Sequence, residues 1–183
     1  MRLFTAVDPS EEVQGKLAEA LEQLRPAARV RWSRPDDLHL TLKFIGEYPD
    51  GKLAALEEAL RGVEWNSGFD VRVRGLGFFP NERDPKVFWA GVDGGLELKD
   101  LAGRIDGAVA ELGVPAERRL FSPHLTLARI EGKAEIGRLR KAIQALDSVE
   151  FGSFRADRFY LYRSQLAPGG AIYLRIGEFG TTS

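Results

Sequence analysis

Hydrophobic and polar positions alternate along several short stretches of the chain, and this alternation predicts β-strands. The clearest stretch is 38–45, Leu-His-Leu-Thr-Leu-Lys-Phe-Ile, in which every second residue is apolar until the end. A second stretch, 123–128, has a similar pattern. Further strands are predicted at 2–7, 28–32, 69–79, 86–92, 149–154, 158–165 and 171–178.

Between these strands, apolar residues recur every three or four positions, which is the spacing of a helix that buries one face. The first such helix follows Ser10, a typical N-cap residue, and ends before Pro26. Helices are predicted over 11–24, 53–61, 98–112 and 136–146. The apolar stripes are typical of helices that pack on a core.

Short connections favour antiparallel pairing of the strands. The loop 80–85, Pro-Asn-Glu-Arg-Asp-Pro, joins two strands directly, and Ala-Pro-Gly-Gly at 167–170 joins the last two. Parallel strands would need longer crossovers. The pattern therefore predicts an α+β fold with mostly antiparallel sheets.

A tetrapeptide repeat suggests that the chain has two similar halves. Residues 39–42, His-Leu-Thr-Leu, recur without change at 124–127, and the same offset relates Val-Asp at 7–8 to Val-Asp at 92–93. Such self-similarity indicates a repeated structural unit. We expect one bilobal domain, 1–183, built from pseudo-repeats of roughly 1–85 and 86–183.

Composition narrows the class of protein. The 183 residues are 44% hydrophobic and 29% charged, which suits a globular core, and the absence of cysteine excludes a disulfide framework or a thiol nucleophile. The net charge of −1 argues against coating nucleic acid by bulk electrostatics. No apolar run approaches the roughly 20 residues of a spanning helix. We expect a soluble, cytoplasmic monomer that does not contact membranes.

Both histidines of the chain lie inside the repeated tetrapeptide. Given a histidine, the three flanking matches have a chance probability on the order of one in a thousand. Residues i and i+2 of a strand share a face, so His39 and Thr41 point one way while their leucine neighbours point toward a core. His124 and Thr126 share a face for the same reason.

A histidine and a hydroxyl on one face suit phosphate chemistry. Imidazole exchanges a proton near neutral pH, with an unperturbed pKa of about 6.5, and a threonine hydroxyl donates to a phosphoryl oxygen. Two facing units would bracket one phosphate, with one imidazole as base and the other as acid. The alternatives are polar surface residues or metal ligands. Neither copy has a cysteine or a second histidine close by in the sequence.

These motifs resemble the paired His-x-Thr-x motifs of the 2H phosphoesterase superfamily. The chain is most similar to its LigT/ThpR-like RNA 2′,3′-cyclic phosphodiesterases, once described as 2′-5′ RNA ligases. The resemblance extends over nearly the whole chain. It is carried by residues 2–4 with Ala6, and by the segments 31–32, 37–46, 123–129, 164–166 and 170–173.

The resemblance implies a bilobal fold, with two mostly antiparallel sheets, outer helices and a central cleft. It implies metal-independent hydrolysis of a terminal 2′,3′-cyclic phosphate on RNA to a 2′-phosphate, with no cofactor. His39 would donate a proton to the departing 3′ oxygen, and His124 would activate water. Thr41 and Thr126 would hold the non-bridging oxygens. A 5′-hydroxyl in place of water would give a 2′-5′ linkage.

Two basic residues near the motifs are further candidate phosphate ligands. The resemblance implies this role for Arg129, yet the fifth position after His124 falls on the opposite face of an ideal strand. We therefore expect the strand to end or bulge near Ala128, or the long side chain to reach round. Lys43, the fourth position after His39, shares the histidine's face in an ideal strand. Its alternative is an ordinary solvated charge.

Basic residues near each motif also suggest a track for an RNA end, with aromatic stacking on Trp32 or Phe121. The alternative is that Trp32 is a core residue and that Asp36 and Asp37 dilute the positive charge. The basic residues are Arg29, Arg31, Arg34, Arg118 and Arg119.

Two other functions fit the same residues. One is a 2H phosphodiesterase that acts on another cyclic phosphate or on a 2′-5′ linkage. The other is a non-catalytic module that holds an RNA end and shows salt-sensitive binding without product.

Overall fold

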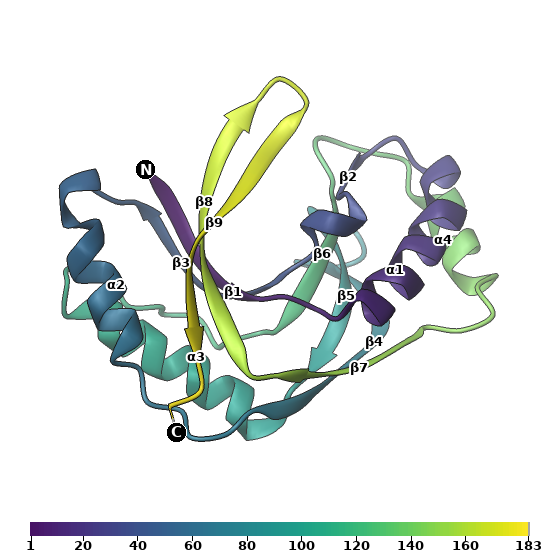
Figure 1. Ribbon diagram of the computed structural model, residues 1–183. Coiled ribbons are helices and arrows are strands. Elements are labelled where there is room, and N and C mark those ends of the chain that lie inside the picture. The colour runs from purple at the N-terminus through teal and green to yellow at the C-terminus, as the bar shows by residue number, and fades with distance from the viewer. Residues whose placement is uncertain (183) are drawn as a thin grey trace.

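The computed structural model describes residues 1–182, in which one curled antiparallel sheet packs against four α-helices (Figure 1). The helices are α1 (Glu11–Leu24), α2 (Leu53–Arg61), α3 (Gly95–Ala110) and α4 (Gly137–Gln144). The strands are β1 (Arg2–Val7), β2 (Arg31–Trp32), β3 (Leu40–Glu47), β4 (Phe69–Phe79), β5 (Val87–Asp93), β6 (His124–Arg129), β7 (Glu150–Ala156), β8 (Arg158–Ala167) and β9 (Gly170–Gly180). Every predicted helix and strand is present, with ends that move by a few residues.

The nine-stranded sheet consists of two halves that meet at one pairing. Its order is β7-β4-β5-β6-β3-β1-β8-β9, and β2 pairs with β6 off this path. β3 and β6 join the halves where Leu40 lies opposite Leu125. The α+β prediction with mostly antiparallel strands is confirmed, and the two expected sheets are joined into one. Each half takes strands from both expected pseudo-repeats, so the division near residue 85 stays a prediction.

The helices lie outside the curled sheet, as Figure 1 shows. α1 and α4 contact each other, and α1 packs on β7. α2 and α3 contact each other on the opposite flank, and α3 packs on β3. At the start of α1, the Ser10 hydroxyl accepts a hydrogen bond from the Val13 amide at 3.3 Å, so the predicted N-cap is confirmed. The inner surface of the sheet is thus left for the cleft.

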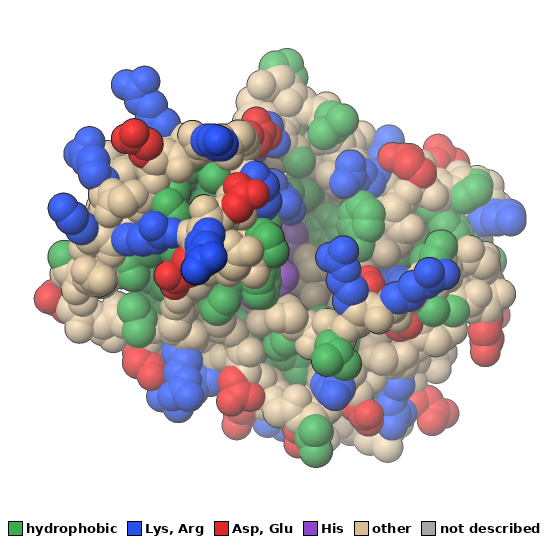
Figure 2. All heavy atoms as spheres, turned by 180° about the vertical axis from the view of Figure 1, so that it is seen from behind, with side chains coloured by type: hydrophobic (Ala, Val, Ile, Leu, Met, Phe, Trp, Pro, Cys, Tyr) green, Lys and Arg blue, Asp and Glu red, His purple; other side chains and the backbone are tan. Residues whose placement is uncertain are grey.

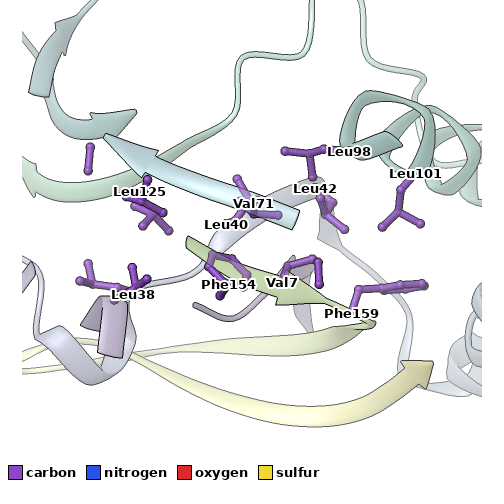
Figure 3. Close-up of a cluster of buried hydrophobic side chains, with 14 of the residues drawn as sticks. Val7, Leu38, Leu40, Leu42, Val71, Leu98, Leu101, Leu125, Phe154 and Phe159 are labelled. Carbon is purple, nitrogen blue, oxygen red and sulfur yellow. The ribbon is translucent and has the colours of Figure 1, made fainter. Parts of the chain in front are cut away.

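The leucines of the two motifs belong to the hydrophobic core. Leu40 is 0% exposed and Leu125 is 1% exposed. Figure 3 shows both of them, with Leu42, in the buried cluster that also contains Leu98 and Leu101 of α3. Burying each leucine contributes about 1.5–3 kcal/mol, so these residues fix which face of each strand points inward. The polar residues between them therefore face the cleft.

The predicted strict alternation of 38–45 is wrong at one point, because β3 contains an extra residue. Ala6 of β1 lies opposite Thr41, but the preceding Thr5 lies opposite Lys43, so Leu42 has no counterpart. Cross-strand partners share a face, and successive residues of β1 face opposite ways. Thr41 and Lys43 therefore lie on opposite faces of the sheet.

A matching irregularity in β6 has the opposite consequence for Arg129. Successive residues of β5, Phe88 and Trp89, lie opposite Ala128 and Thr126, so the residue between these two is extra. The expected bulge near Ala128 is confirmed. The bulge places Arg129 on the same face as Thr126. In an ideal strand these two residues, three positions apart, would face opposite ways.

Candidate active site

The register between β3 and β6 brings the two motifs together. Leu40 lies opposite Leu125 in an antiparallel pair, and each of these residues directly follows a histidine. Stepping one residue along both strands therefore brings His39 beside Thr126 and His124 beside Thr41. Each histidine thus lies next to the threonine of the other motif, on the face away from the core.

Two cavities meet at these side chains. His39, Thr41, Thr126 and Arg129 line a cavity of about 350 Å³. Thr41 and His124 line a second cavity of about 870 Å³, which opens toward α3. Thr41 lines both, so the two cavities adjoin at this residue, with His39 in one and His124 in the other. In Figure 2, histidine side chains lie at the bottom of a hollow with Lys and Arg side chains on both sides.

His39 lies among aromatic rings. Its ring stacks on Phe4 with centroids 4.7 Å apart, and on Tyr162 at 5.7 Å. The ring of Tyr173, from the β8–β9 hairpin, meets its edge at 4.9 Å. These three rings pack around the imidazole and leave His39 half-buried.

Burial in this aromatic surrounding lowers the pKa of His39 from its ordinary value. The carboxylate of Asp8 opposes this shift, as does a hydrogen bond to the backbone of Asp37. Arg129 adds to the lowering, because a neighbouring positive charge disfavours the imidazolium. A phosphate anion placed between His39 and Arg129 would raise the pKa of His39, because a negative charge favours the imidazolium.

His124 is held in a different way. Its Nδ1 donates a hydrogen bond to the carbonyl oxygen of Ser122 at 2.7 Å, and its ring contacts the edge of Phe79 with centroids 5.0 Å apart. A carbonyl oxygen only accepts, so Nδ1 carries the hydrogen and Nε2 of the neutral ring has a free lone pair. This tautomer suits a general base.

A polar cluster behind His39 was not identified from the sequence. The hydroxyl of Tyr162 donates to Asp8 at 2.7 Å, and Arg175 forms an ion pair with the same carboxylate. Burial raises the pKa of Tyr162, and the bond to Asp8 raises it further, so the hydroxyl stays protonated. The only sequence signal was the repeated Val-Asp pair that contains Asp8. Tyr162 lies 154 residues away in the chain, so no local pattern connects the two.

The prediction that Lys43 shares the catalytic face is wrong. Its Nζ donates to the carbonyl oxygen of Pro115 at 2.7 Å and pairs with Asp106 at 2.5 Å. Lys43 is only 5% exposed, and the bulge in β3 turns it away from Thr41. Its ammonium group is engaged by Asp106 and Pro115, although the residue also lines the cavity that contains Thr41 and His124.

The predicted basic track is only partly assembled. Arg31, Trp32 and Arg34 line the cavity that holds His39, while Arg119 and Phe121 line the one that holds His124. Arg29 lines a separate cavity of about 990 Å³ that contains neither histidine, and Arg118 lines none of these. The side chains of Arg31 and Arg34 pair with Glu131 and Asp37. Trp32 packs on the core residue Phe88.

A metal site and a membrane-spanning helix are two further features that would bear on function. Within 1–182, no group of three or more His, Asp or Glu side chains is arranged to hold a metal ion. In the same part of the chain, no helix is both long and apolar enough to cross a membrane.

Comparison with known proteins identifies the family of the chain. The model of the family described as LigT like Phosphoesterase matches residues 7–89 and 93–173, which include both histidine motifs. The chain belongs to this family. The resemblance to the 2H phosphoesterases is thereby confirmed.

Several relatives match the chain over almost its whole length. The RNA 2′,3′-cyclic phosphodiesterase of Methanothermobacter thermautotrophicus is 37% identical over 184 residues, which is 98% of each chain. The protein of the same name from Archaeoglobus fulgidus is 35% identical over 180 residues, covering 97% of this chain and all of that one. Both relatives therefore match this chain along almost its whole length and not only in a shared segment.

Solved structures share the fold over almost the whole chain. The Escherichia coli LigT structure in complex with 3′-AMP matches with a TM-score of 0.82 and 27% identity, over 100% of this chain and 98% of that one. The structure of TT0787 of Thermus thermophilus matches with a TM-score of 0.80 and 35% identity, over 98% and 97% of the two chains.

Proposed function

We propose that this protein hydrolyses the 2′,3′-cyclic phosphate at the end of an RNA strand and leaves a 2′-phosphate. The observation that carries the proposal is the register of β3 and β6, which sets each histidine beside the threonine of the other motif. The names of the full-length relatives supply the substrate class. Arg129, on the face of Thr126, adds a positive charge to the same cavity.

The proposed reaction needs one base and one acid on opposite sides of phosphorus. Nε2 of His124 takes a proton from water, and the resulting hydroxide attacks phosphorus. The bond from phosphorus to the 3′ oxygen breaks, and His39 gives its proton to that oxygen. Each transfer contributes typically about 10²–10⁴ in rate.

Thr41, Thr126 and Arg129 would bind the non-bridging oxygens while this happens. Two hydroxyl donors and a guanidinium match the charge that gathers on these oxygens. The threonines lie beside the opposing histidines, so the phosphate that they hold is within reach of both imidazoles. The chemistry as proposed is completed by these side chains and uses no metal or cofactor.

The lowered pKa of His39 bears on its role as acid. The neutral form predominates in the free protein near neutral pH, so the proton donor must form when substrate binds or at lower pH. A bound phosphate anion favours the imidazolium beside it. We infer that the substrate itself helps to protonate its own acid.

The proposal is tested with a short RNA that carries a 2′,3′-cyclic phosphate end, incubated with and without a chelator. The expected product has its phosphate on the 2′ oxygen, and the chelator leaves the rate unchanged. A 3′-phosphate product would mean that the other bond breaks. Salt-sensitive binding with no product would instead favour an RNA-end-binding module.

The substrate is tested by competition between cyclic phosphates. RNA ends, cyclic mononucleotides, ADP-ribose cyclic phosphate and a 2′-5′-linked dinucleotide are compared by kcat/KM. We expect RNA ends to be the best substrates. A preference for any of the others would redirect the proposal within the 2H phosphoesterases.

A further inference from the structure

A hollow outside the two histidine cavities carries a concentration of positive charge. It measures about 990 Å³ and lies where α4 meets the 3₁₀ turn η1 (Arg25–Ala27). We name it the basic groove, because Arg25, Arg29, Arg138 and Lys141 line it. We propose that the basic groove binds upstream phosphates of the RNA strand whose cyclic end is being hydrolysed. The inference rests on the proposed function and adds a binding site for a part of the substrate remote from the reacting phosphate.

The charge of the basic groove differs from that of the whole chain. Four basic side chains and a single acidic one, Glu135, line the groove, whereas the chain has a net charge of −1. None of the four basic side chains forms an ion pair within residues 1–182. In the His39 cavity, by contrast, Arg31 and Arg34 both pair with carboxylates. The groove therefore has positive charge left to meet the phosphates of a nucleic acid.

One short segment of the chain separates the basic groove from the His39 cavity. The indole of Trp32, which lines the cavity, donates to the carbonyl oxygen of Ala28, which lines the groove, at 3.2 Å. The guanidinium of Arg25 in the groove donates to the carbonyl oxygen of Ser33 at 3.1 Å, and Ser33 lines the cavity. The two hollows therefore lie on either side of residues 28–33.

The distance between the two hollows is short. Arg29 lines the basic groove and Arg31 lines the His39 cavity, so two steps of backbone, at most about 7 Å, connect them. A single strand whose end lies in the cavity can thus reach the groove without crossing another element of the fold.

The direction of the proposed reaction sends the strand toward this side. The attacking and departing oxygens lie in line, on opposite sides of phosphorus. The departing 3′ oxygen faces His39, and it belongs to the last ribose of the RNA. That ribose, with the rest of the strand attached to its 5′ carbon, therefore lies on the His39 side, while water enters beside His124. The basic groove lies beyond the cavity through which the strand leaves.

Both walls of the basic groove carry positive charge. Arg25 and Arg29 come from the wall formed by η1 and the residues after it. Arg138 and Lys141 come from α4, which lies on the outer flank beside α1 (Figure 1). These two residues are exposed and three positions apart, so they share one face of the helix. A positive groove of this kind tracks the backbone of a single strand and does not read its bases.

The test compares substrates that reach the basic groove with one that does not. The kcat/KM for hydrolysis is measured on single-stranded RNAs of increasing length with a cyclic phosphate end, and on a cyclic mononucleotide, which has no upstream phosphates. The variant Arg138→Glu/Lys141→Glu reverses two exposed charges. We expect kcat/KM on the longest RNA to fall by roughly tenfold or more, and kcat/KM on the mononucleotide to change by less than about twofold.

The salt dependence of binding counts the phosphate contacts. For single strands, the logarithm of the binding constant falls with the logarithm of the salt concentration, with a slope of about −0.7 per neutralised phosphate. Arg138→Gln/Lys141→Gln removes two contacts, so the slope for a long RNA with a 3′-hydroxyl end should become shallower by about 1.4. Fluorescence anisotropy over a range of salt concentrations measures this change. A merely structural effect of the substitutions on α4 would leave the slope unchanged.

A matched control makes the same charge change elsewhere. Lys52 and Arg61 are exposed and line neither the basic groove nor the two histidine cavities. Lys52→Glu/Arg61→Glu should leave every rate and the salt slope unchanged. The control separates loss of the groove from the general effect of a more negative protein.

The outcomes separate this inference from the proposed function. Equal kcat/KM of the wild type on RNAs of all lengths would overturn the inference and leave the proposed function intact. The same conclusion follows if the groove variant loses no activity on long RNA, loses as much on the mononucleotide, or keeps the salt slope of the wild type. Failure of the wild type to hydrolyse any of these substrates would overturn the proposed function and the inference with it.

Discussion

Leu40 of β3 lies opposite Leu125 of β6, and this single pairing joins the two halves of the sheet. Both leucines are buried in the core, so the pairing is fixed by packing and not by the polar residues beside it. Because a histidine directly precedes each leucine, the core contact also determines where the two imidazoles lie. A slip of one residue in either strand would turn the motif of that strand to the wrong face.

Arg129 is expected to bind the phosphate, and its removal should weaken catalysis. Arg129→Ala loses charge-assisted hydrogen bonds worth about 1.5–3 kcal/mol, which corresponds to a fall in kcat/KM of roughly 10- to 150-fold. Steady-state kinetics on a cyclic-phosphate RNA measure this fall. Arg61→Ala on α2 is the control. Equal kinetics of the Arg129 variant and the wild type would remove this residue from the site.

Lys43 should matter for stability and not for catalysis. Lys43→Met removes the ion-pair partner of Asp106, which costs about 1–3 kcal/mol of unfolding free energy. Urea denaturation measures this loss, and a double-mutant cycle with Asp106→Asn shows whether the two residues are coupled. We expect kcat/KM to stay within about threefold of wild type once folded protein is compared. A raised KM with unchanged stability would restore Lys43 as a phosphate ligand.

Asp8 should control the pH dependence through His39. Its charge raises the pKa of His39, so Asp8→Asn lowers that pKa further. If His39 is the acid, kcat/KM falls as pH rises through this pKa, and the variant shifts the alkaline limb to lower pH. The shift is measured by kcat/KM between about pH 5 and pH 8.

The sign of this effect separates the two roles of His39. If His39 were the base, Asp8→Asn would move the acidic limb to lower pH and leave the alkaline limb in place. Asp157→Asn is the control, because Asp157 pairs with Arg158 and is not among the groups that shift the pKa of His39. An unchanged profile in the Asp8 variant would mean that His39 does not limit the rate in either direction.

Gly77 should be required because Trp89 crosses over it. A Cβ built on Gly77 would lie 2.2 Å from Cζ2 of the indole, which is far inside van der Waals contact. We expect Gly77→Ala to lower the unfolding free energy by about 1–3 kcal/mol in urea denaturation. Gly107→Ala on α3 meets nothing within 4 Å, and should raise stability by about 0.5–1 kcal/mol. Equal effects of the two changes would show that the Trp89 contact is not tight.

The sequence predicted the elements and the histidine face because these depend on local periodicity. Alternation and helical spacing indicate which side of each element is buried, and the leucines beside His39 and His124 show this pattern clearly. The motif residues could therefore be placed on one face before any coordinates were known.

The position of Lys43 could not be read in the same way. Strict alternation assigns it to the face of Thr41, but the register with β1 skips a residue at Leu42. Such a bulge is set by the packing of neighbouring strands, and a single strand's pattern does not reveal it. For Arg129, strict alternation conflicted with the expected role as a phosphate ligand. This conflict predicted the bulge in β6, whereas no such conflict existed for Lys43 in β3.

The surroundings of His39 were also beyond the sequence. Phe4 of β1 is distant in the chain from Tyr162 and Tyr173 of the β8–β9 hairpin, and the pairing of β1 with β8 brings them around one ring. The same holds for the bond between Tyr162 and Asp8. These contacts depend on topology, whereas the motifs depend on local pattern.

The central claim is that His39 and His124 act together on one phosphorus atom. The most direct measurement is the single-turnover hydrolysis rate of a cyclic-phosphate RNA by His39→Ala, by His124→Ala and by the double variant. We predict a loss of about 10²–10⁴ in each single variant, with RNA binding largely retained. Turnover near the wild-type rate in either single variant would contradict the account.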